Sequence, residues 1–255
     1  MKTIAENTRN DTYYTKLADT WWDKNGPLWP IHTLNEIRTQ YLTECMLDYF
    51  GLDEKTSQPL TGIRIVDVGC GGGVLSESMA RLGASVTGID IVERNIHVAH
   101  YHAQQQGLDI NYKVTTVEAL QKEGCQFDVV LNMEVVEHVS NLANFMQSCN
   151  QLVRPKGLMF IATINRTPLA WLTAIIGAEY ILRWLPRGTH QWHKFRKPEE
   201  LEQCLRQGGL DIFERSGVQV NPFNRKMRLS HKTSINYMLV AQKIANHDGN
   251  IGVQV

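Results

Sequence analysis

Hydrophobic and polar positions along this chain fall into short blocks that predict strands and helices in turn. Five apolar runs rich in β-branched residues predict strands, at 63–68, 85–90, 110–114, 127–132 and 158–163. Runs with helical spacing lie between them and predict helices at 74–82, 93–106, 117–122 and 141–152. Strands that alternate with helices indicate an α/β fold, a mostly parallel sheet with helices on both faces.

The flanking segments extend this pattern. Two later strands, over roughly 212–220 and 235–242, bring the predicted sheet to seven strands. Residues 1–61 predict an N-terminal helical cap, and residues 244–255 a flexible tail. The main domain is therefore expected to span 62–243, with a helical insertion over 165–195 that interrupts the alternation.

Composition narrows the functional classes. A chain of 255 residues can bury a sizeable core as one or two domains. Its 26 basic and 26 acidic residues cancel, so no global basic field points to nucleic acid. Five scattered cysteines without a C-x-x-C pair argue against a disulfide framework or structural zinc. With no signal-peptide pattern and no run of about twenty apolar residues, a cytoplasmic location is expected.

Residues 66–73, Val-Asp-Val-Gly-Cys-Gly-Gly-Gly, carry the strongest chemical signal. Glycines between a strand and a helix let the backbone approach a ligand and adopt positive φ angles. The dinucleotide pattern G-x-G-x-x-G would need a glycine at Val74, so the spacing disfavours a nicotinamide dehydrogenase. D-V-G-C-G-G-G instead resembles motif I of class I S-adenosylmethionine-dependent methyltransferases, which places Asp67, Gly69 and Gly71 at the cofactor. The alternative is a glycine-rich turn without a ligand.

Asp90 predicts the second half of the same pocket. It ends the second predicted strand, seventeen residues after Gly73. A carboxylate there can accept hydrogen bonds from both ribose hydroxyls of an adenosine. The alternative is an exposed acid at a strand end. In the methyltransferase fold the loop after the third strand lies against adenine, so Val117 and Glu118 are candidate adenine neighbours.

Further motifs resemble the ubiquinone biosynthesis O-methyltransferases, over roughly residues 18–243. They are Trp21-Trp22-Asp23, His32-x-x-Asn35-x-x-Arg38, Met133 to Val139, Gly177 to Arg183, Pro186 to His190, Val220-Asn221-Pro222 and Asn236-Tyr237-Met238. One departure is Arg187, where the family usually has Lys. The resemblance implies a Rossmann-like class I fold with a reversed final hairpin. It also implies S-adenosylmethionine-dependent methylation of catechol or phenol hydroxyls on polyprenylated precursors of ubiquinone.

The resemblance also assigns two side chains to the cofactor. Arg38 would meet the methionine carboxylate of S-adenosylmethionine, a contact suited to the fork of a guanidinium. Met133 would line the pocket near the sulfonium or the adenosine. Without the family, a surface arginine and a core methionine are the simpler interpretations.

Glu134, Glu137 and His138 form a polar cluster after the fourth predicted strand. The resemblance implies a Mg²⁺ site at these three positions, and carboxylate oxygens suit that ion. Against it, similar E-H-V segments occur in metal-free class I methyltransferases, and histidine is an unusual magnesium ligand. A second interpretation makes His138 or Glu134 the general base that removes the hydroxyl proton. The residues alone do not separate these interpretations.

Residues 168–185 predict a helix with a broad apolar surface. Trp171 and Trp184 lie among aliphatic residues, with Arg183 and Arg187 close by. This composition suits a core or lid helix, or a helix that lies in the membrane interface. Because a polyprenyl tail partitions into the bilayer, we expect a lid that also touches the inner membrane. A peripheral enzyme of this kind would have other ubiquinone-biosynthesis enzymes as potential partners.

Two other functions are compatible with parts of this pattern. The protein could methylate a soluble phenol, or it could bind the cofactor without catalysis as a scaffold in a biosynthetic complex. A nucleic-acid methyltransferase is disfavoured by the neutral net charge and by the absence of an N-P-P-Y-type motif after the fourth predicted strand.

Overall fold

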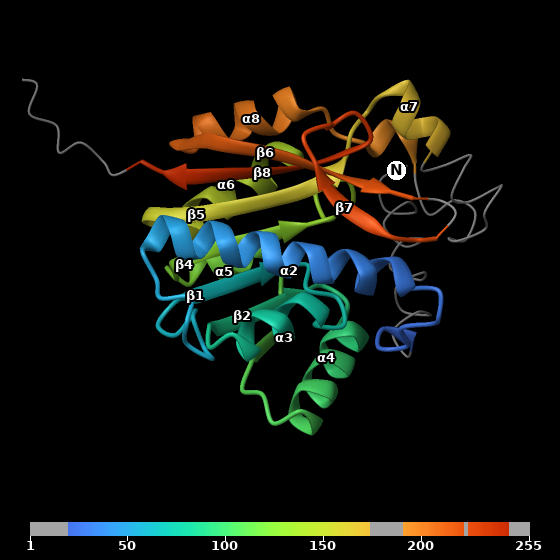
Figure 1. Ribbon diagram of the computed structural model, residues 1–255. Coiled ribbons are helices and arrows are strands. Elements are labelled where there is room, and N and C mark those ends of the chain that lie inside the picture. The colour runs from blue at the N-terminus through green and yellow to red at the C-terminus, as the bar shows by residue number, and fades with distance from the viewer. Residues whose placement is uncertain (1–19, 174–190, 222–223, 245–255) are drawn as a thin grey trace, which may run out of the picture.

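The computed structural model describes residues 20–173, 191–221 and 224–244 and contains one twisted sheet (Figure 1). Its strand order is β3-β2-β1-β4-β5-β8-β6-β7. Five strands run parallel, and their bounds are β1 Arg64–Val68, β2 Ser85–Asp90, β3 Asn111–Val114, β4 Phe127–Met133 and β5 Val153–Ile164. All five coincide with the strands predicted from the sequence, although β5 begins five residues earlier than the predicted 158.

The remaining strands are antiparallel. β8 (Asn236–Lys243) pairs with β5 and with β6 (Leu210–Val220), which confirms the expected reversed final hairpin. The predicted count of seven is wrong by one, because β7 (Met227–Ser230) adds an eighth strand beside β6. β7 has only four residues, Met-Arg-Leu-Ser, which is too short a run for alternation to reveal.

Helices cover both faces of the sheet (Figure 1). One face carries three of them: α2 Trp29–Phe50, α3 Val74–Arg81 and α4 Glu93–Gln105. The other face carries α5 Val117–Lys122, α6 Leu142–Leu152 and α8 Pro198–Gln207. In β4, Val129 and Leu131 are buried on the face covered by α2, α3 and α4, and Val130 is buried on the opposite face. Apolar residues must point both ways in such a strand, so its sequence is continuously hydrophobic.

The helical cap expected at the N-terminus consists, within the described residues, mainly of the 22-residue helix α2. Pro30 lies in its first turn, where a missing N–H costs nothing. Gly51 ends it in the left-handed region with φ 64°. Tyr41, Leu42 and Met46 are buried in the same core as the sheet, so α2 packs as part of the domain. Residues 1–19 and 245–255 lie outside the described residues.

Helix α8 was not predicted, because the sequence analysis assigned no element between the insertion, which ends at 195, and the strand expected from 212. Its first turn nevertheless carries recognisable signals, with Pro198 at the start and two acidic residues after it. The Lys197 N–H donates to Glu200 Oε2 at 2.8 Å, which satisfies one free amide at the helix start. These signals were missed because the segment after the insertion was left without an assigned element.

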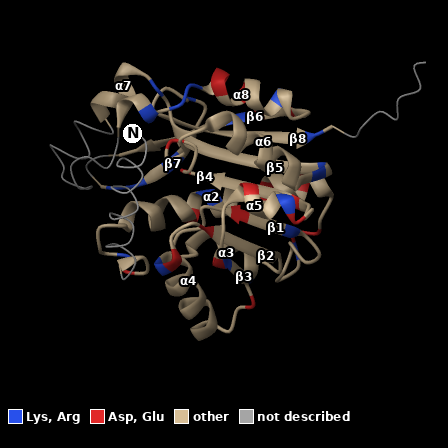
Figure 2. Ribbon diagram, turned by 180° about the vertical axis from the view of Figure 1, so that it is seen from behind, with Lys and Arg blue, Asp and Glu red and all other residues tan. Residues whose placement is uncertain are grey.

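Charged residues of both signs are scattered over the molecule, as the view from behind shows (Figure 2). This distribution agrees with a formal net charge of zero. Among the residues that the structure describes, no helix is long and apolar enough to cross a membrane.

Candidate active site

A cavity of about 380 Å³ opens where β1, β2 and β4 end at their carboxyl edges. Ligand sites of open α/β sheets lie at this edge. The lining includes all eight residues that the sequence assigned to the cofactor: Arg38, Asp67, Gly69, Gly71, Asp90, Val117, Glu118 and Met133. Glu134 and His138 line the same cavity, whereas Glu137 does not.

The glycine loop, residues 69–73, directly follows β1 and packs tightly against neighbouring segments. Gly69, Gly71 and Gly73 have φ angles of 70°, 54° and 85°, which glycine adopts without a steric penalty. A Cβ atom on Gly69 would lie 2.6 Å from Val135 Cγ2. The Gly69 and Cys70 amides donate to Ile89 O at 2.8 and 2.9 Å and tie the loop to the end of β2. The tight path therefore requires glycine at these positions.

Asp67 lies beneath this loop with only 3% of its surface exposed. The Ser76 hydroxyl donates to its Oδ2 at 2.6 Å. Burial raises the pKa of Asp67 to about 6, because an ionised carboxylate loses its hydration there. The hydrogen bond from Ser76 and the charge of Arg38 oppose this effect in part.

Asp90 links the glycine loop to the start of α4. Its Oδ2 accepts from the Gly71 amide at 3.0 Å and from Asn95 Nδ2 at 3.4 Å, while Oδ1 accepts from the Val92 amide at 2.8 Å. Burial raises the pKa of this carboxyl as well. A carboxylate has about four acceptor sites. The three protein donors use much of this capacity, so a ligand hydroxyl would share an oxygen of Asp90 with one of them.

Arg38 and Glu134 meet across the cavity. The Arg38 guanidinium donates from Nη2 to Glu134 Oε1, and Arg38 is 7% exposed. Its Nε is buried and has no hydrogen-bond partner among the described residues. A buried guanidinium with a spare donor beside a cavity fits a ligand carboxylate. Glu134 itself has φ 58°, and its amide donates to Ala162 O at 2.8 Å.

Comparison with known proteins decides the family. A family model described as a methyltransferase domain matches residues 38–215. The Ubiquinone biosynthesis O-methyltransferase of Brucella anthropi is 50% identical over 233 residues, which cover 91% of this chain and 94% of that protein. The protein of the same name from Sinorhizobium fredii is 49% identical over 230 residues, which cover 90% and 93%. The chain belongs to the ubiquinone biosynthesis O-methyltransferase family.

Solved structures confirm the class I methyltransferase fold of this family member. Magnesium protoporphyrin IX methyltransferase from Synechocystis, solved with bound SAH, superimposes with a TM-score of 0.64 at 18% identity. That match covers 93% of this chain and 99% of the other. An S-adenosylmethionine-dependent methyltransferase from Clostridium acetobutylicum gives a TM-score of 0.57 at 12% identity, covering 81% and 91%.

The magnesium site that the family resemblance implies does not fit this arrangement. Glu134 is paired with Arg38, and Glu137 Oε2 accepts from the Thr163 hydroxyl at 2.8 Å. His138 Nε2 lies 4.0 Å from Glu137 Oε1. No group of three or more His, Cys, Asp or Glu side chains in the described ranges is placed to hold a metal ion. The magnesium assignment stays a prediction for experiment.

Arg196 is a site residue that the sequence analysis missed. Its guanidinium donates to Val136 O at 3.2 Å and to Val139 O at 3.4 Å, both on the loop that carries Glu137 and His138. The Tyr237 hydroxyl donates to Arg196 O at 3.0 Å and fixes this residue to β8. A lone arginine before a helix carries no motif, so only the tertiary contacts reveal it.

The Trp21-Trp22 pair also contributes more than its sequence indicated. Trp21 lines the cavity and packs on the glycine loop, where a Cβ atom on Gly71 would lie 2.5 Å from its ring. Trp21 Nε1 donates to Asn95 Oδ1 at 3.0 Å. The pair belongs to one of the family motifs, but its residue types alone assign it no chemical role. Asn95, which joins Trp21 to Asp90, had no sequence signal.

Most of the predicted insertion falls outside the described residues. The structure describes α7 (Pro168–Ala170) and residues up to 173, and it resumes at 191. Within that part Leu169, Trp171 and Leu172 are 46%, 43% and 53% exposed. The motifs Gly177 to Arg183 and Pro186 to His190, and with them Trp184, lie outside the described residues.

Proposed function

We propose that this protein transfers a methyl group from S-adenosylmethionine to a phenolic oxygen of an intermediate in ubiquinone biosynthesis. The observation that carries the proposal is identity of about 50% over nine-tenths of both chains to proteins named for that reaction. The cavity supports it, because one space gathers all eight residues assigned to the cofactor.

The cofactor residues have distinct tasks in this proposal. Asp90 accepts the ribose hydroxyls, and Arg38 binds the methionine carboxylate through its spare Nε donor. Val117, which is buried, and Glu118 border the adenine side of the same cavity. Gly69, Gly71 and Asp67 shape the loop, and Met133 follows on β4. When bound, S-adenosylmethionine supplies an electrophilic methyl carbon on its sulfonium.

Proton removal from the acceptor hydroxyl is assigned to His138. Its ring lines the cavity beside Glu134 and lies next to Glu137 in the chain. A neutral imidazole is suited to accept a proton near neutral pH. Glu134 is the alternative base, but its carboxylate already accepts from Arg38. The protein's main contribution is then alignment of the acceptor oxygen with the methyl group and removal of its proton.

A polyprenylated catechol or phenol is the acceptor that we propose, with its ring in the cavity and its tail at a membrane surface. The exposed side chains of Leu169, Trp171 and Leu172 support membrane contact, since apolar and indole groups favour the interface. Asn165 Nδ2 donates to Thr233 O at 2.9 Å and ties the start of this segment to the residues before β8.

The charge of the β6–β7 hairpin also favours membrane association. Residues 216–244 contain five Lys or Arg residues and no Asp or Glu. Arg225, Lys226 and Arg228 are exposed on this hairpin, and the Arg225 guanidinium lies 4.7 Å from the centroid of the Trp29 ring on α2. Each basic residue near an anionic leaflet adds about 1 kcal/mol of attraction. We therefore propose peripheral association with the inner membrane, and contacts with other enzymes of the pathway stay a prediction.

The test is methyl transfer from labelled S-adenosylmethionine to a polyprenylated catechol and to a short-chain catechol. We expect product with the polyprenylated acceptor and less with the short one. Equal rates would favour the soluble-phenol alternative. Cofactor binding without any product would favour the scaffold alternative.

The same assay tests the metal. Product that disappears with EDTA and returns with Mg²⁺ would support the ligand set Glu134, Glu137 and His138 predicted from the sequence. Product indifferent to EDTA would support the arrangement in the structure, where Arg38 and Thr163 hold the two carboxylates.

A further inference from the structure

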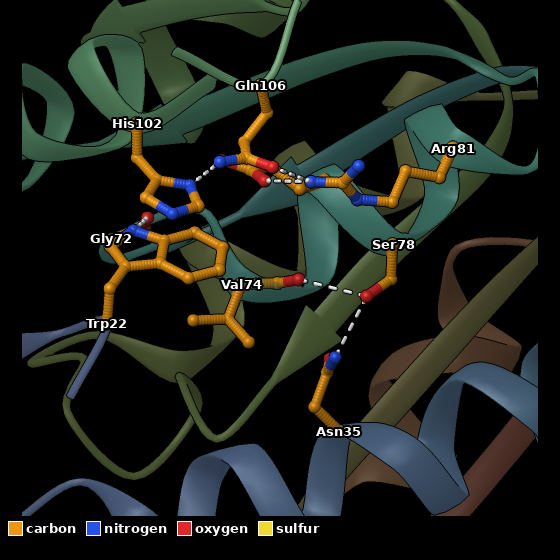
Figure 3. A network of polar contacts seen from close by, with 9 residues as sticks. Trp22, Asn35, Gly72, Val74, Ser78, Arg81, His102 and Gln106 are labelled. Atoms are coloured by element: carbon orange, nitrogen blue, oxygen red, sulfur yellow. Dashed lines mark hydrogen bonds and ion pairs between the residues drawn. The ribbon is translucent and has the colours of Figure 1, made fainter. Parts of the chain in front are cut away.

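Trp22 contacts the glycine loop from outside the cavity. Its Nε1 donates to Gly72 O at 3.0 Å. Its ring stacks on the His102 imidazole with centroids 3.5 Å apart and planes 7° from parallel (Figure 3). Neither Trp22 nor His102 lines the cavity. The pair therefore reaches the candidate cofactor site only through the loop.

The His102 ring is held by a buried carboxylate. His102 Nδ1 lies 2.6 Å from Glu77 Oε1, and Glu77 is 2% exposed. The second oxygen of Glu77 accepts from Arg81 Nη2 at 3.2 Å, and Arg81 also donates to Gln106 (Figure 3). Charge-assisted hydrogen bonds of this kind fix geometry more strongly than neutral ones. The surface against which Trp22 stacks is therefore rigid.

The loop needs such support because of its composition. Four of the five residues 69–73 are glycine, and glycine loses the most backbone entropy on being ordered. Trp21 supports one side, since a Cβ atom on Gly72 would lie 2.3 Å from its ring. Trp22 supplies the directional contact, because its N–H bonds the Gly72 carbonyl.

We infer that Trp22, stacked on His102 and bonded to Gly72, is a positioning residue that keeps the cofactor loop in its binding conformation. If the loop holds that conformation for only a fraction of the time, the apparent Kd rises by the inverse of the fraction. This inference rests on the proposed function, since it requires the loop to bind S-adenosylmethionine. Trp22 touches none of the reacting groups, so its loss should weaken cofactor binding and leave the chemical step unchanged.

Trp22→Phe isolates the hydrogen bond, because phenylalanine can still stack on His102 but cannot donate to Gly72 O. We expect the Kd for S-adenosylmethionine, measured by calorimetry, to rise about two- to tenfold, the worth of one hydrogen bond. Turnover at saturating cofactor should stay at the wild-type value. Amide exchange in a peptide covering 69–74 should accelerate without cofactor and slow again when it is added. An unchanged Kd, or a fall in saturated turnover, would overturn the positioning role.

A second variant reaches the loop without altering Trp22. His102→Asn removes the stacked ring but leaves an amide that can donate to Glu77, and the Kd should rise in the same direction. The matched control is His100→Asn, on the exposed side of the same helix, where the His100 Nε2 atom lies 2.9 Å from Gln104 Nε2. Its Kd should not change. Wild-type protein that binds no S-adenosylmethionine would instead contradict the proposed function.

Discussion

The Arg38 guanidinium and the Glu134 carboxylate form an ion pair across the candidate active site, although 96 residues separate them in the chain. The sequence assigned Arg38 to the cofactor and Glu134 to methyl transfer or metal binding. The ion pair couples these two roles, because the Arg38 guanidinium faces both the cavity and the Glu134 carboxylate. A substitution of Glu134 should therefore change both turnover and cofactor binding.

Glu134→Gln should lower turnover about 10- to 100-fold, because it removes the negative charge at the acceptor end of the cavity. The Kd for S-adenosylmethionine should stay equal or fall, since Arg38 loses its competing anion. Steady-state kinetics and calorimetry separate the two effects. Glu36→Gln, an exposed position on α2, is the control. Turnover near the wild-type rate would exclude a catalytic role for Glu134.

Asp90→Asn should weaken S-adenosylmethionine binding at least about tenfold, because a neutral amide is a poorer acceptor for two ribose hydroxyls. The thermal midpoint should fall as well, since the Gly71 and Val92 amides donate to different oxygens of Asp90 and the single oxygen of Asn can keep only one of these contacts. Calorimetry and a thermal scan give both quantities. Asp109→Asn, which alters an exposed acid after α4, should bind like the wild type. A retained Kd in Asp90→Asn would remove this residue from the cofactor site.

Asp67→Asn should stabilise the protein at neutral pH. The pKa of Asp67 is about 6 in the folded protein against an ordinary 3.8, so the folded state holds its proton longer. The free energy of unfolding therefore falls as pH rises from about 4 to about 6 and stays lower above that. The variant, which keeps an acceptor for Ser76, should gain roughly 1–3 kcal/mol at pH 7.5 and less at pH 5.

Urea unfolding at the two pH values measures this gain. Asp211→Asn is the control, because Asp211 is exposed and its substitution should show no pH-dependent difference from the wild type. A gain in Asp67→Asn that is as large at pH 5 as at pH 7.5 would contradict a raised pKa as its cause.

Gly72→Ala should destabilise the protein by about 1–3 kcal/mol, because the new methyl group would lie 2.3 Å from the Trp21 Cγ. Chemical unfolding measures the loss. In a Trp21→Ala background the same substitution should cost clearly less, since the clashing ring is gone. Equal costs in both backgrounds would show that Trp21 does not pack on the loop in solution.

Paired substitutions Trp171→Glu and Leu172→Glu should reduce flotation with vesicles that contain an anionic phospholipid, because they place charge on an apolar surface. Phe213→Glu is the matched control, since Phe213 is 48% exposed on β6 and lies outside the proposed surface. Flotation should fall in the first variant and persist in the control. Unchanged flotation of the first variant would reject the segment that follows α7 as a membrane contact.

Local patterns in the sequence were sufficient for the parallel half of the sheet and for several of the residues that line the cavity at its carboxyl edge. Strands β1 to β4 and helices α3 to α6 follow from runs whose period does not depend on distant partners. The loop around Gly69 and the acid Asp90 were recognisable because short-range backbone geometry demands those residue types at that spacing. Family motifs added Arg38 and Met133, which residue type alone would not have selected.

The tertiary structure decided which of these groups meet. The sequence could not show that Arg38 pairs with Glu134 or that the Thr163 hydroxyl donates to Glu137. It also could not show that Arg196 donates to the backbone of the loop that carries Glu137. These contacts join segments 26 to 96 residues apart, and no periodicity encodes them. The sequence alone determined the parallel strands, the helices between them and the polar residue types that follow these strands. The packing of α2, β5 and the segment before α8 decided the geometry, because contact energies depend on distances that only the folded chain fixes.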